Sequence, residues 1–333
     1  MKAIVLDVIG GRLGLQEVEP PAPGESQVLI RVHASGVNFA DSQIRTGQYP
    51  FLPPTPVIPG NEVAGIVAGI GNGVDGGLAG KRVVATLSGT GGFGGYAEYA
   101  IAPVESIAVI PDAVSDDQAL AVLMQGLTAY FLLTEPARLS PGNSVLIHAA
   151  AGGVGSIAIQ LAKLMGVEKV FAAVGNPRKL AVARSLGADV VLNYTEDEWT
   201  DEVLKATDGR GVDVILASST ESISRQSLEV LAPQGRFVVY GSIDVKTASL
   251  SPEQILQLVF KNQSLTGFYI GGFISMPESF RKAIDYLLYL VAKGALQVIS
   301  TPYLLEDAQL AHEAMAERKT IGKVFLKTKY YEN

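Results

Sequence analysis

The stretch from Val145 to Gly166, VLIHAAAGGVGSIAIQLAKLMG, joins an apolar run to an amphipathic run through a glycine-rich turn. The turn reads A-A-G-G-V-G from residue 150 to residue 155, an A-x-G-x-x-G form of the pattern that binds dinucleotide phosphates between a strand and a helix. The sequence predicts that these residues meet a pyrophosphate at a helix N-terminus, whose free N–H groups favour anions. The predicted contacts are Ala151, Gly152, Gly153 and Val154. The alternative is a purely structural turn.

Two positions of the turn constrain its backbone geometry. Gly155 lets the helix approach the strand closely, because it has no Cβ. Ala150 stands where the first glycine of the pattern would be, so the turn must be made without a positive φ at that residue.

The middle of the chain alternates short apolar runs with helical stretches. Runs at 144–150, 169–174, 189–193, 212–219 and 236–241 read as strands, and the segments 156–166, 177–187 and 222–235 read as helices. Such alternation predicts βαβ units and a parallel sheet that is covered on both faces. The turn at 150–155 therefore has the strand–turn–helix setting that a nucleotide site requires.

The flanking regions have a different pattern. The first 110 or so residues contain strand-like runs separated by Pro- and Gly-rich turns, which predicts a mostly β unit. The tail mixes helical segments at 276–295 and 306–319 with strands at 297–305 and 322–327. We expect the tail to pack on the N-terminal unit, with the parallel-sheet domain inserted between them.

Composition excludes several classes of protein. The net charge of −7, without a stripe of Lys and Arg, argues against nucleic-acid binding. With no cysteine and three histidines, disulfides, thiolate nucleophiles and a Cys- or His-built metal site are not expected. No apolar run is long enough to cross a bilayer and no secretory signal is recognisable, so a cytoplasmic location is expected.

The segment after the second strand favours one nicotinamide cofactor. A site for NAD would carry Asp or Glu about 20 residues after the glycine turn, to bind the ribose 2′-hydroxyl. Gly175 stands there instead, and Arg178 and Lys179 follow. A missing carboxylate beside two cations fits a 2′-phosphate and predicts NADPH, although the two cations alone could be ordinary surface charges.

Five ordered segments stand out along the chain, namely GVNFADSQIRTGQYP, PGNEVAGIV, QGLTAYFLL, HAAAGGVGSIAIQLAK and GKVFLK. Together they resemble the medium-chain dehydrogenase/reductase superfamily, and most closely its zinc-independent quinone oxidoreductases and the related vesicle-protein branch. The resemblance implies an α/β protein with a GroES-like, mostly β catalytic domain at 1–120 and 275–333. It also implies a Rossmann domain with a doubly wound parallel sheet at 121–274, which binds NADP(H). A homodimer formed through the edge of that sheet is expected as well.

The resemblance assigns further cofactor contacts. Thr128 is expected near the nicotinamide, and Gly175, Lys179 and Tyr194 are expected around the 2′-phosphate. The later cofactor-contacting segments supply Gly241, Ser242, Phe268, Ile270 and Lys323. Without the resemblance, Tyr194 could equally be a strand-end tyrosine and Gly241 a simple turn.

Two departures from the family pattern concern the chemistry. Asn61 in PGNE stands where zinc alcohol dehydrogenases carry a histidine, and with no cysteine in the chain the zinc ligand sets are missing. Gln43 stands where many quinone oxidoreductases carry a tyrosine, a candidate proton donor or substrate contact. The proton donor is therefore not assigned by the resemblance.

The chemistry expected without a metal is hydride transfer from NADPH to a quinone or an α,β-unsaturated carbonyl. Asn38 is the candidate catalytic residue that hydrogen-bonds the developing oxyanion, unless it only holds a turn, and Gln43 is a candidate substrate contact. Asp41 is expected to be structural, Glu62 to be a buried carboxylate, and His148 to be packed rather than catalytic. The alternatives are an enoyl-thioester reductase and a non-enzymatic NADPH-binding regulatory or RNA-binding protein.

Overall fold

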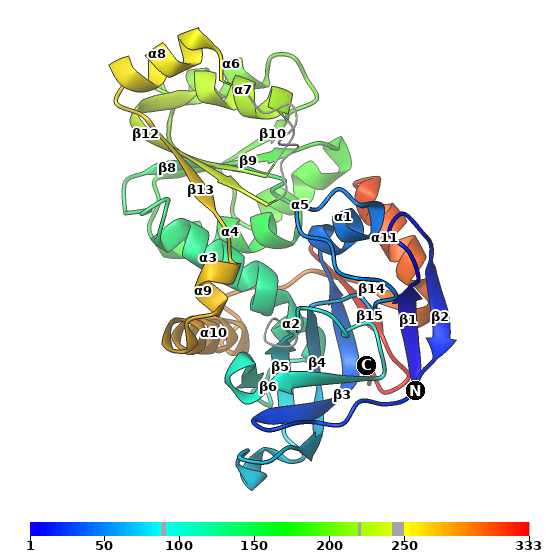
Figure 1. The fold of residues 1–333 in the computed structure, drawn as a ribbon. Helices are drawn as coiled ribbons and strands as arrows, with labels where there is room; N and C mark the ends of the chain where they lie inside the picture. Colours follow the sequence, from blue (N-terminus) through cyan, green and yellow to red (C-terminus); the bar gives the residue numbers. More distant parts are fainter. Residues whose placement is uncertain (88–90, 219–220, 242–249, 333) are drawn as a thin grey trace. The chain divides into compact units, whose positions relative to one another are not determined.

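The computed structural model of the 333-residue chain describes residues 1–87, 91–218, 221–241 and 250–332. The chain forms two compact units, shown in Figure 1. Unit 1 comprises Met1–Leu127 and Ile274–Asn333, and unit 2 comprises Thr128–Phe273. The chain thus enters and leaves unit 2 once, as expected for a domain inserted into another.

Unit 2 contains a parallel sheet with the strand order β10-β9-β8-β11-β12-β13. The order reverses beside β8, the first strand, which is the topological switch point of a doubly wound sheet. The strands are β8 (Ser144–His148), β9 (Lys169–Val174), β10 (Val190–Asn193), β11 (Val212–Ala217), β12 (Leu231–Tyr240) and β13 (Ser264–Phe268). All five residues of β8 are buried, as continuous apolar runs of a doubly covered sheet should be.

Helices cover both faces of this sheet, with α4 and α5 on one face and α6, α7 and α8 on the other (Figure 1). One core joins the strands to α6 and α7 through Trp199, Val203 and Leu228. The helices of the unit are α3 (Leu127–Thr134), α4 (Gly153–Leu164), α5 (Leu180–Ser185), α6 (Trp199–Ala206), α7 (Glu221–Glu229), α8 (Pro252–Phe260) and α9 (Gly271–Ile274).

Unit 1 is mostly β. Its larger sheet has the order β14-β15-β3-β4-β5-β7, with β6 also paired to β3, and β1 and β2 form a separate antiparallel pair. The strands are β1 (Lys2–Leu6), β2 (Leu13–Glu17), β3 (Gln27–Val37), β4 (Glu62–Ile70), β5 (Arg82–Thr86), β6 (Tyr99–Pro103), β7 (Ile107–Val109), β14 (Ser300–Leu304) and β15 (Lys323–Lys327). Because β15 pairs antiparallel with β3, the tail does return to the N-terminal unit.

The helices of unit 1 connect and cover these strands. They are α1 (Phe39–Thr46), α2 (Asp116–Ala121), α10 (Pro277–Ala292) and α11 (Ala308–Ala316), and a π-helical turn, η4 (Val122–Gly126), follows α2. α10 begins with proline at its first turn and buries one apolar face that includes Phe280, Ile284 and Leu287. Within the described ranges, no helix has the length and apolar character needed to cross a bilayer.

Two local predictions were wrong. The helix expected over 222–235 ends at Glu229, and β12 begins at Leu231, because Pro233 and Gly235 do not suit a helix. A register irregularity in the β11–β12 pairing lets the strand continue through this segment. The helical spacing of the apolar residues between Ile157 and Met165 predicts one buried stripe on α4, but Leu164 is 50% exposed where α4 ends.

Candidate functional site

The carboxyl ends of the strands in unit 2 carry most of the predicted cofactor residues. Ala151 to Val154 follow β8, Gly175 follows β9, Tyr194 follows β10 and Gly241 follows β12. Because the strands are parallel, these ends lie along one edge of the sheet, which is where ligands bind in such folds.

Ala149, the residue before the glycine-rich turn, has a left-handed backbone conformation (φ 50°). Ala150 does not have a positive φ, as predicted. Gly152 is the N-cap residue of α4 and has an extended conformation. A Cβ on Gly155 would lie 2.5 Å from the Ala149 carbonyl oxygen and 2.6 Å from Cα of Ala150. Glycine at 155 is therefore required for the close approach of α4 to the turn.

The N-terminus of α4 offers free donors. Gly152 contributes no side-chain cap. The N–H groups of Gly153 and Val154 have no hydrogen-bond partner among the described residues, and both residues are half-buried. Unpaired N–H groups at the start of a 12-residue helix form a site suited to an anion such as a pyrophosphate.

Gly175 and Tyr194 lie against each other at the ends of β9 and β10. A Cβ on Gly175 would lie 2.6 Å from Cζ of Tyr194, so the phenol fills the space of the missing side chain. The short helical turn Pro177–Lys179 follows directly, with the Arg178 side chain exposed and Lys179 half-buried. The segment 175–180, GNPRKL, contains no acidic residue, and the cations Arg178 and Lys179 follow Gly175 within four residues.

The remaining predicted cofactor residues of unit 2 are less closely grouped. Gly241 has φ 74°, which glycine adopts readily, and Ser242 lies outside the described residues. Phe268 ends β13 and stacks on Phe273 with ring centroids 5.3 Å apart. Ile270 follows two residues later and is half-buried. Thr128 is half-buried near the start of α3.

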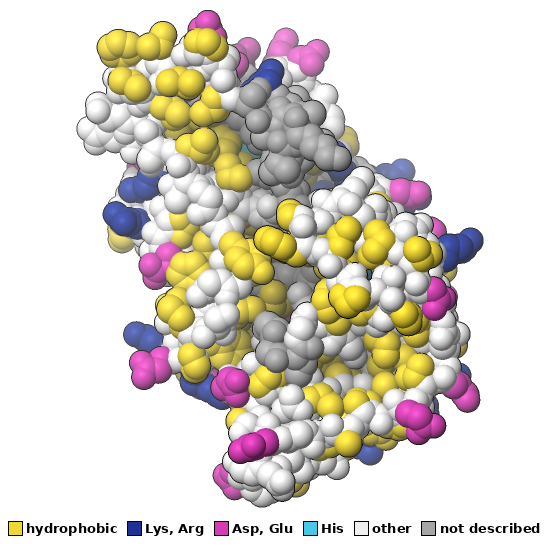
Figure 2. Space-filling view, in the orientation of Figure 1, with side chains coloured by type: hydrophobic (Ala, Val, Ile, Leu, Met, Phe, Trp, Pro, Cys, Tyr) yellow, Lys and Arg dark blue, Asp and Glu magenta, His cyan; other side chains and the backbone are white. Residues whose placement is uncertain are grey.

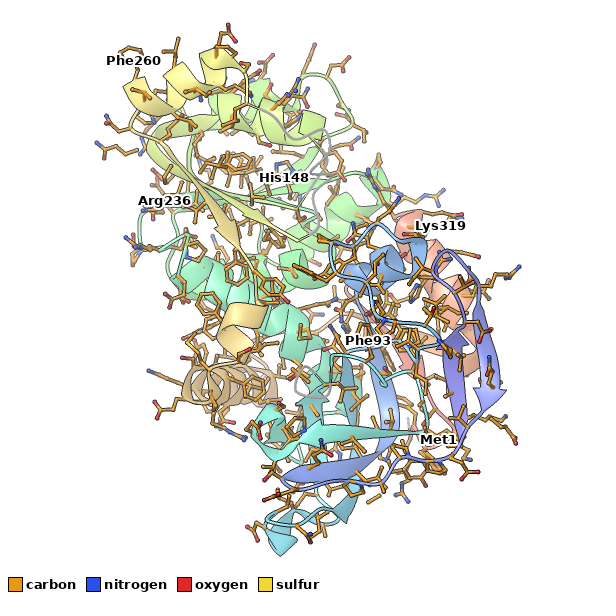
Figure 3. The ribbon with its side chains drawn as sticks, viewed as in Figure 1. Met1, Phe93, His148, Arg236, Phe260 and Lys319 are labelled. Atoms are coloured by element: carbon orange, nitrogen blue, oxygen red, sulfur yellow. The ribbon has the colours of Figure 1, made fainter. Side chains whose placement is uncertain are left out.

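His148, the last residue of β8, is packed inside unit 2, as predicted (Figure 3). Its Nε2 lies 2.7 Å from the hydroxyl of Ser227. Burial lowers the pKa of His148 to about 4, so the ring is neutral at pH 7. These features fit a structural histidine.

Unit 1 contains a buried polar cluster, which we define as Asn38, Asn61, Glu62, Gln125 and Lys323. Glu62 begins β4 and Lys323 begins β15, and both side chains are fully buried and form an ion pair. The second carboxylate oxygen of Glu62 accepts the Met124 N–H at 3.2 Å. A buried ion pair is tolerated only when its other hydrogen-bonding positions are also filled.

Asn38 lies at the centre of this cluster. Its Nδ2 donates to Oε1 of Glu62 at 2.6 Å and to Oδ1 of Asn61 at 3.0 Å. Its Oδ1 accepts from Nζ of Lys323 at 3.1 Å and, at the long distance of 3.5 Å, from Nε2 of Gln125. Both amide hydrogens are thus committed, which is at odds with the prediction that Asn38 itself donates to an oxyanion.

Two glycines of the family-like segments make room for this region. A Cβ on Gly36 would lie 2.6 Å from Cδ of Glu62, and a Cβ on Gly60 would lie 2.7 Å from Cε1 of Tyr96. The glycine of SGVNFAD therefore admits the buried carboxylate. The glycine of PGNE, which has φ 89°, admits the tyrosine ring.

Asp41 is structural, as predicted, and forms hydrogen bonds that hold the loop before α1. Its Oδ2 accepts the Asn38 backbone N–H at 2.8 Å and the Tyr96 hydroxyl at 3.2 Å. The Tyr96 hydroxyl also lies 3.0 Å from Nε2 of His312. Burial, as the largest cause, raises the pKa of Asp41 to about 7, and burial lowers that of His312 to about 3.

Lys323, which the resemblance places in a cofactor-contacting segment, lies in unit 1. Its ammonium is buried against Glu62 and Asn38. Its backbone N–H donates to the Ile299 carbonyl in the same unit. The expected contact with the cofactor stays a prediction.

Gln43 and Gln125 share an unusual feature. The side-chain oxygen of each is buried and has no hydrogen-bond partner among the described residues. Gln43 lies on α1 and remains a predicted substrate contact. The sequence reasoning missed Gln125, although it is the first residue of the QGLTAYFLL segment that was used for the resemblance. Buried acceptors of this kind can be satisfied by a donor on a ligand.

A separate cavity adds no site to those described above. A cavity of about 390 Å³ lies between α7 and α8, and none of the predicted site residues lines it. Across the part of the chain that the structure describes, no three His, Cys, Asp or Glu side chains are grouped so that they could hold a metal ion.

Comparison with known proteins places the chain in a family. The alcohol dehydrogenase GroES-like domain matches residues 24–112, and the zinc-binding dehydrogenase family matches residues 153–288. Quinone oxidoreductase of Salmonella typhimurium is 35% identical over 324 residues, which cover 95% of this chain and 96% of that protein. The chain belongs to the medium-chain dehydrogenase/reductase superfamily. Within this superfamily it falls among the zinc-independent, quinone oxidoreductase-like members.

Two other members of the superfamily are similarly close. The rat synaptic vesicle membrane protein VAT-1 homolog is 33% identical over 345 residues, which cover 98% of this chain and 84% of that protein. The crystal structure of Escherichia coli quinone oxidoreductase complexed with NADPH superposes with a TM-score of 0.89 at 33% identity. The superposition covers 98% of this chain and 100% of the Escherichia coli chain, so the predicted GroES-like and Rossmann folds are confirmed.

Proposed function

We propose that this protein is an NADPH-dependent reductase that transfers hydride to a quinone or an α,β-unsaturated carbonyl. The observation that carries the proposal is the anion site at the start of α4, combined with the Gly175–Tyr194 contact where an NAD site would have an acid. Similarity to quinone oxidoreductases, one of them solved with NADPH, supports the same conclusion.

In this proposal unit 2 is the NADPH domain. The N–H groups of Gly153 and Val154 would hold the pyrophosphate, with Ala151 and Gly152 lining the turn. Arg178 and Lys179 would pair with the 2′-phosphate beside Tyr194, because cations and a phenol suit a dianion and a carboxylate would repel it. Gly241, Ser242, Phe268, Ile270 and Thr128 would line the rest of the cofactor, as the resemblance implies.

Bound NADPH supplies the hydride for the reduction. Addition of hydride to the conjugated acceptor moves an electron pair onto its oxygen, and amide N–H groups can stabilise that charge. Unit 1 supplies such amides in the buried polar cluster and in Gln43. Gln43 would contact the acceptor through its side-chain amide, whose nitrogen can donate to the acceptor oxygen.

We also propose that the protein is a homodimer that pairs through β13. This strand is at the edge of the unit 2 sheet, and an unpaired edge can extend into a second sheet. Hydrophobic side chains gather over α8, next to that edge, as Figure 2 shows. Ile255, Leu256, Val259 and Phe260 are each 50–80% exposed, and Phe260 lies at the outer end of α8 (Figure 3).

Steady-state oxidation of NADPH against a panel of acceptors tests the proposed reaction. The panel contains ortho- and para-quinones, alkenals, cyclic enones and enoyl-CoA esters, and the expected result is turnover with quinones or enones. Turnover confined to enoyl-CoA esters would indicate an enoyl-thioester reductase instead. Tight NADPH binding with no turnover across the panel would contradict both enzyme functions.

A further inference from the structure

We propose that the side-chain amide nitrogen of Asn61 is the hydrogen-bond donor to the acceptor oxygen on which charge develops, and that Lys323, Glu62 and Asn38 are positioning residues that orient it. This inference rests on the proposed reductase function and names a catalytic residue for it. It follows from the polarity of the hydrogen bonds in the buried polar cluster.

The orientation of Asn38 is fixed by two charged groups of opposite polarity. The Lys323 ammonium can only donate, so the Asn38 atom facing it at 3.1 Å must be the carbonyl oxygen. The ionised Glu62 carboxylate can only accept, so the atom facing it at 2.6 Å must be the amide nitrogen. Each of these contacts independently excludes the flipped amide.

The orientation of Asn61 follows from that of Asn38. The second hydrogen on Asn38 Nδ2 points to Asn61, and the atom that receives it at 3.0 Å must be an acceptor, Oδ1. In a planar amide the nitrogen lies on the other side of Cγ, so Nδ2 of Asn61 faces away from Asn38. The ion pair thus sets the direction of the Asn61 donors through one intervening side chain.

The Asn61 donors are free and accessible. Nδ2 of Asn61 has no hydrogen-bond partner among the described residues, and it does not belong to the buried unpartnered atoms of the chain. The residue is half-buried, and its carbonyl accepts the Leu87 N–H at 2.8 Å, which anchors the backbone. The Asn61 donor thus stands on an anchored backbone, has its direction set by the ion pair through Asn38, and has no partner among the described residues. Such a donor is preorganised for an incoming oxygen.

Reduction of the acceptor needs no proton from a protein side chain. For an enone, hydride bonds to the β-carbon, the C=C π pair shifts toward the carbonyl, and the carbonyl π pair becomes the oxyanion. Asn61 donates a hydrogen bond to that oxyanion and keeps its proton. Water then protonates the enolate at the α-carbon, which completes the saturated ketone. The amide takes the part that a metal cation plays in metal-dependent carbonyl chemistry.

The kinetic test uses Asn61→Asp and Asn61→Leu. Aspartate keeps an acceptor for Asn38 but has no N–H to donate, and leucine removes both functions at similar volume. We expect kcat for a quinone or enone to fall by about 10²–10³-fold in both variants, with the Kd for NADPH unchanged. Asn72→Asp, an exposed asparagine before β5, is the matched control and should be within twofold of wild type.

A spectroscopic readout separates a catalytic from a merely structural role. In ¹⁵N-labelled protein, the side-chain NH₂ resonances of Asn61 are assigned by their loss in Asn61→Asp. Adding 4-nitrophenolate as an oxyanion probe should shift those resonances and leave the Asn38 pair in place. Unfolding midpoints of the variants close to that of wild type would show that the activity loss is not a loss of fold.

Two results would overturn the inference. If wild type reduces the panel and both Asn61 variants stay within twofold of it, Asn61 is not the donor and the reductase function stands. If the phenolate shifts the Asn38 resonances and not those of Asn61, the polarity argument is wrong. A wild-type protein that reduces none of the acceptors would instead remove the proposed function on which the inference rests.

Discussion

The phenol of Tyr194 occupies the space that a side chain at Gly175 would need, since a Cβ there would lie 2.6 Å from Cζ of Tyr194. The two residues directly follow the neighbouring strands β9 and β10, at the point where an NAD site would carry an acid. Glycine at 175 and tyrosine at 194 are thus sterically coupled, at the position that is expected to distinguish NADP(H) from NAD.

This contact predicts strong coupling between the two residues. Gly175→Ala should destabilise the protein by about 1–3 kcal/mol through overpacking. In a Tyr194→Ala background the same change should cost much less, because the phenol is gone. Chemical denaturation of the four proteins of this cycle gives the coupling energy. Additive effects would show that the ring moves aside easily and does not define the site.

The cations after β9 should select NADPH over NADH. Arg178→Ala combined with Lys179→Ala should weaken NADPH binding by roughly 10²–10⁴-fold, since each of the two charge-assisted hydrogen bonds contributes about 1.5–3 kcal/mol, and should leave NADH binding unchanged. Calorimetric titration measures both affinities. Lys205→Ala, an exposed lysine on α6, is the matched control. Equal affinities of wild type for the two cofactors would contradict the assignment to the 2′-phosphate.

The sequence predicted the features that depend on local pattern. Continuous apolar runs identified the parallel strands, and the glycine spacing identified the turn before α4, because both are set by neighbours in the chain. The absence of an acid at position 175 could also be recognised from the sequence, because that position lies at a set spacing after the glycine turn. Position along a known motif also indicated Asn38 and Glu62.

The sequence could not predict how residues distant in the chain combine. Lys323 lies 261 residues from Glu62, so nothing local indicated that its ammonium is buried on that carboxylate. Asn38 was expected to donate to an oxyanion, but its hydrogens are committed to Asn61 and Glu62. The direction of an amide depends on its partners in space, which no spacing rule supplies.

The buried ion pair gives a stability prediction. Lys323→Met leaves the Glu62 carboxylate buried without its cation, and unfolding should become easier by about 3–5 kcal/mol. Adding Glu62→Gln should recover part of that loss, because the uncompensated charge is removed. The exposed pair of Lys319 and Glu317 is the control, and Lys319→Met should change the free energy of unfolding much less, because that pair is exposed to solvent. Similar losses at the two lysines would contradict the account of the cluster.

Asp41 predicts a distinctive dependence of stability on pH. Its pKa is raised to about 7 in the native state and is near 4 when unfolded, so the native state holds the extra proton between these values. The free energy of unfolding contributed by Asp41 therefore falls as the pH rises from about 4 to about 7. Asp41→Asn cannot ionise, so its stability relative to wild type should rise over that range, by roughly 4 kcal/mol in total.

Comparing the two proteins at each pH isolates Asp41. The lowered pKa values of His148 and His312 act in the opposite direction, making the protein less stable as the pH falls below about 6.5, and they are common to both proteins. Denaturation at pH 4, 5.5, 7 and 8.5 measures the difference. A difference that does not change with pH would mean that Asp41 titrates normally in the native state.

The apolar face of α8 predicts the oligomeric state. Phe260 is 80% exposed beside the free edge of the sheet, so Phe260→Asp should convert a dimer into a monomer. Phe51→Asp, at a residue of unit 1 that is 78% exposed, should leave the dimer intact. Light scattering coupled to size exclusion reports the mass. A wild-type monomer, or a dimer insensitive to Phe260→Asp, would contradict pairing through this edge.

Transfer of deuterium from the cofactor to an enone tests the central claim most directly. NADPH that carries deuterium in place of one of the two hydrogens on C4 of the nicotinamide is incubated with the protein and cyclohexenone. The product is analysed by mass spectrometry and NMR. The account predicts one deuterium at the β-carbon of cyclohexanone from only one of the two labelled forms. NADPH bound with neither cyclohexenone nor a quinone reduced, or cyclohexanone without deuterium from either form, would contradict it.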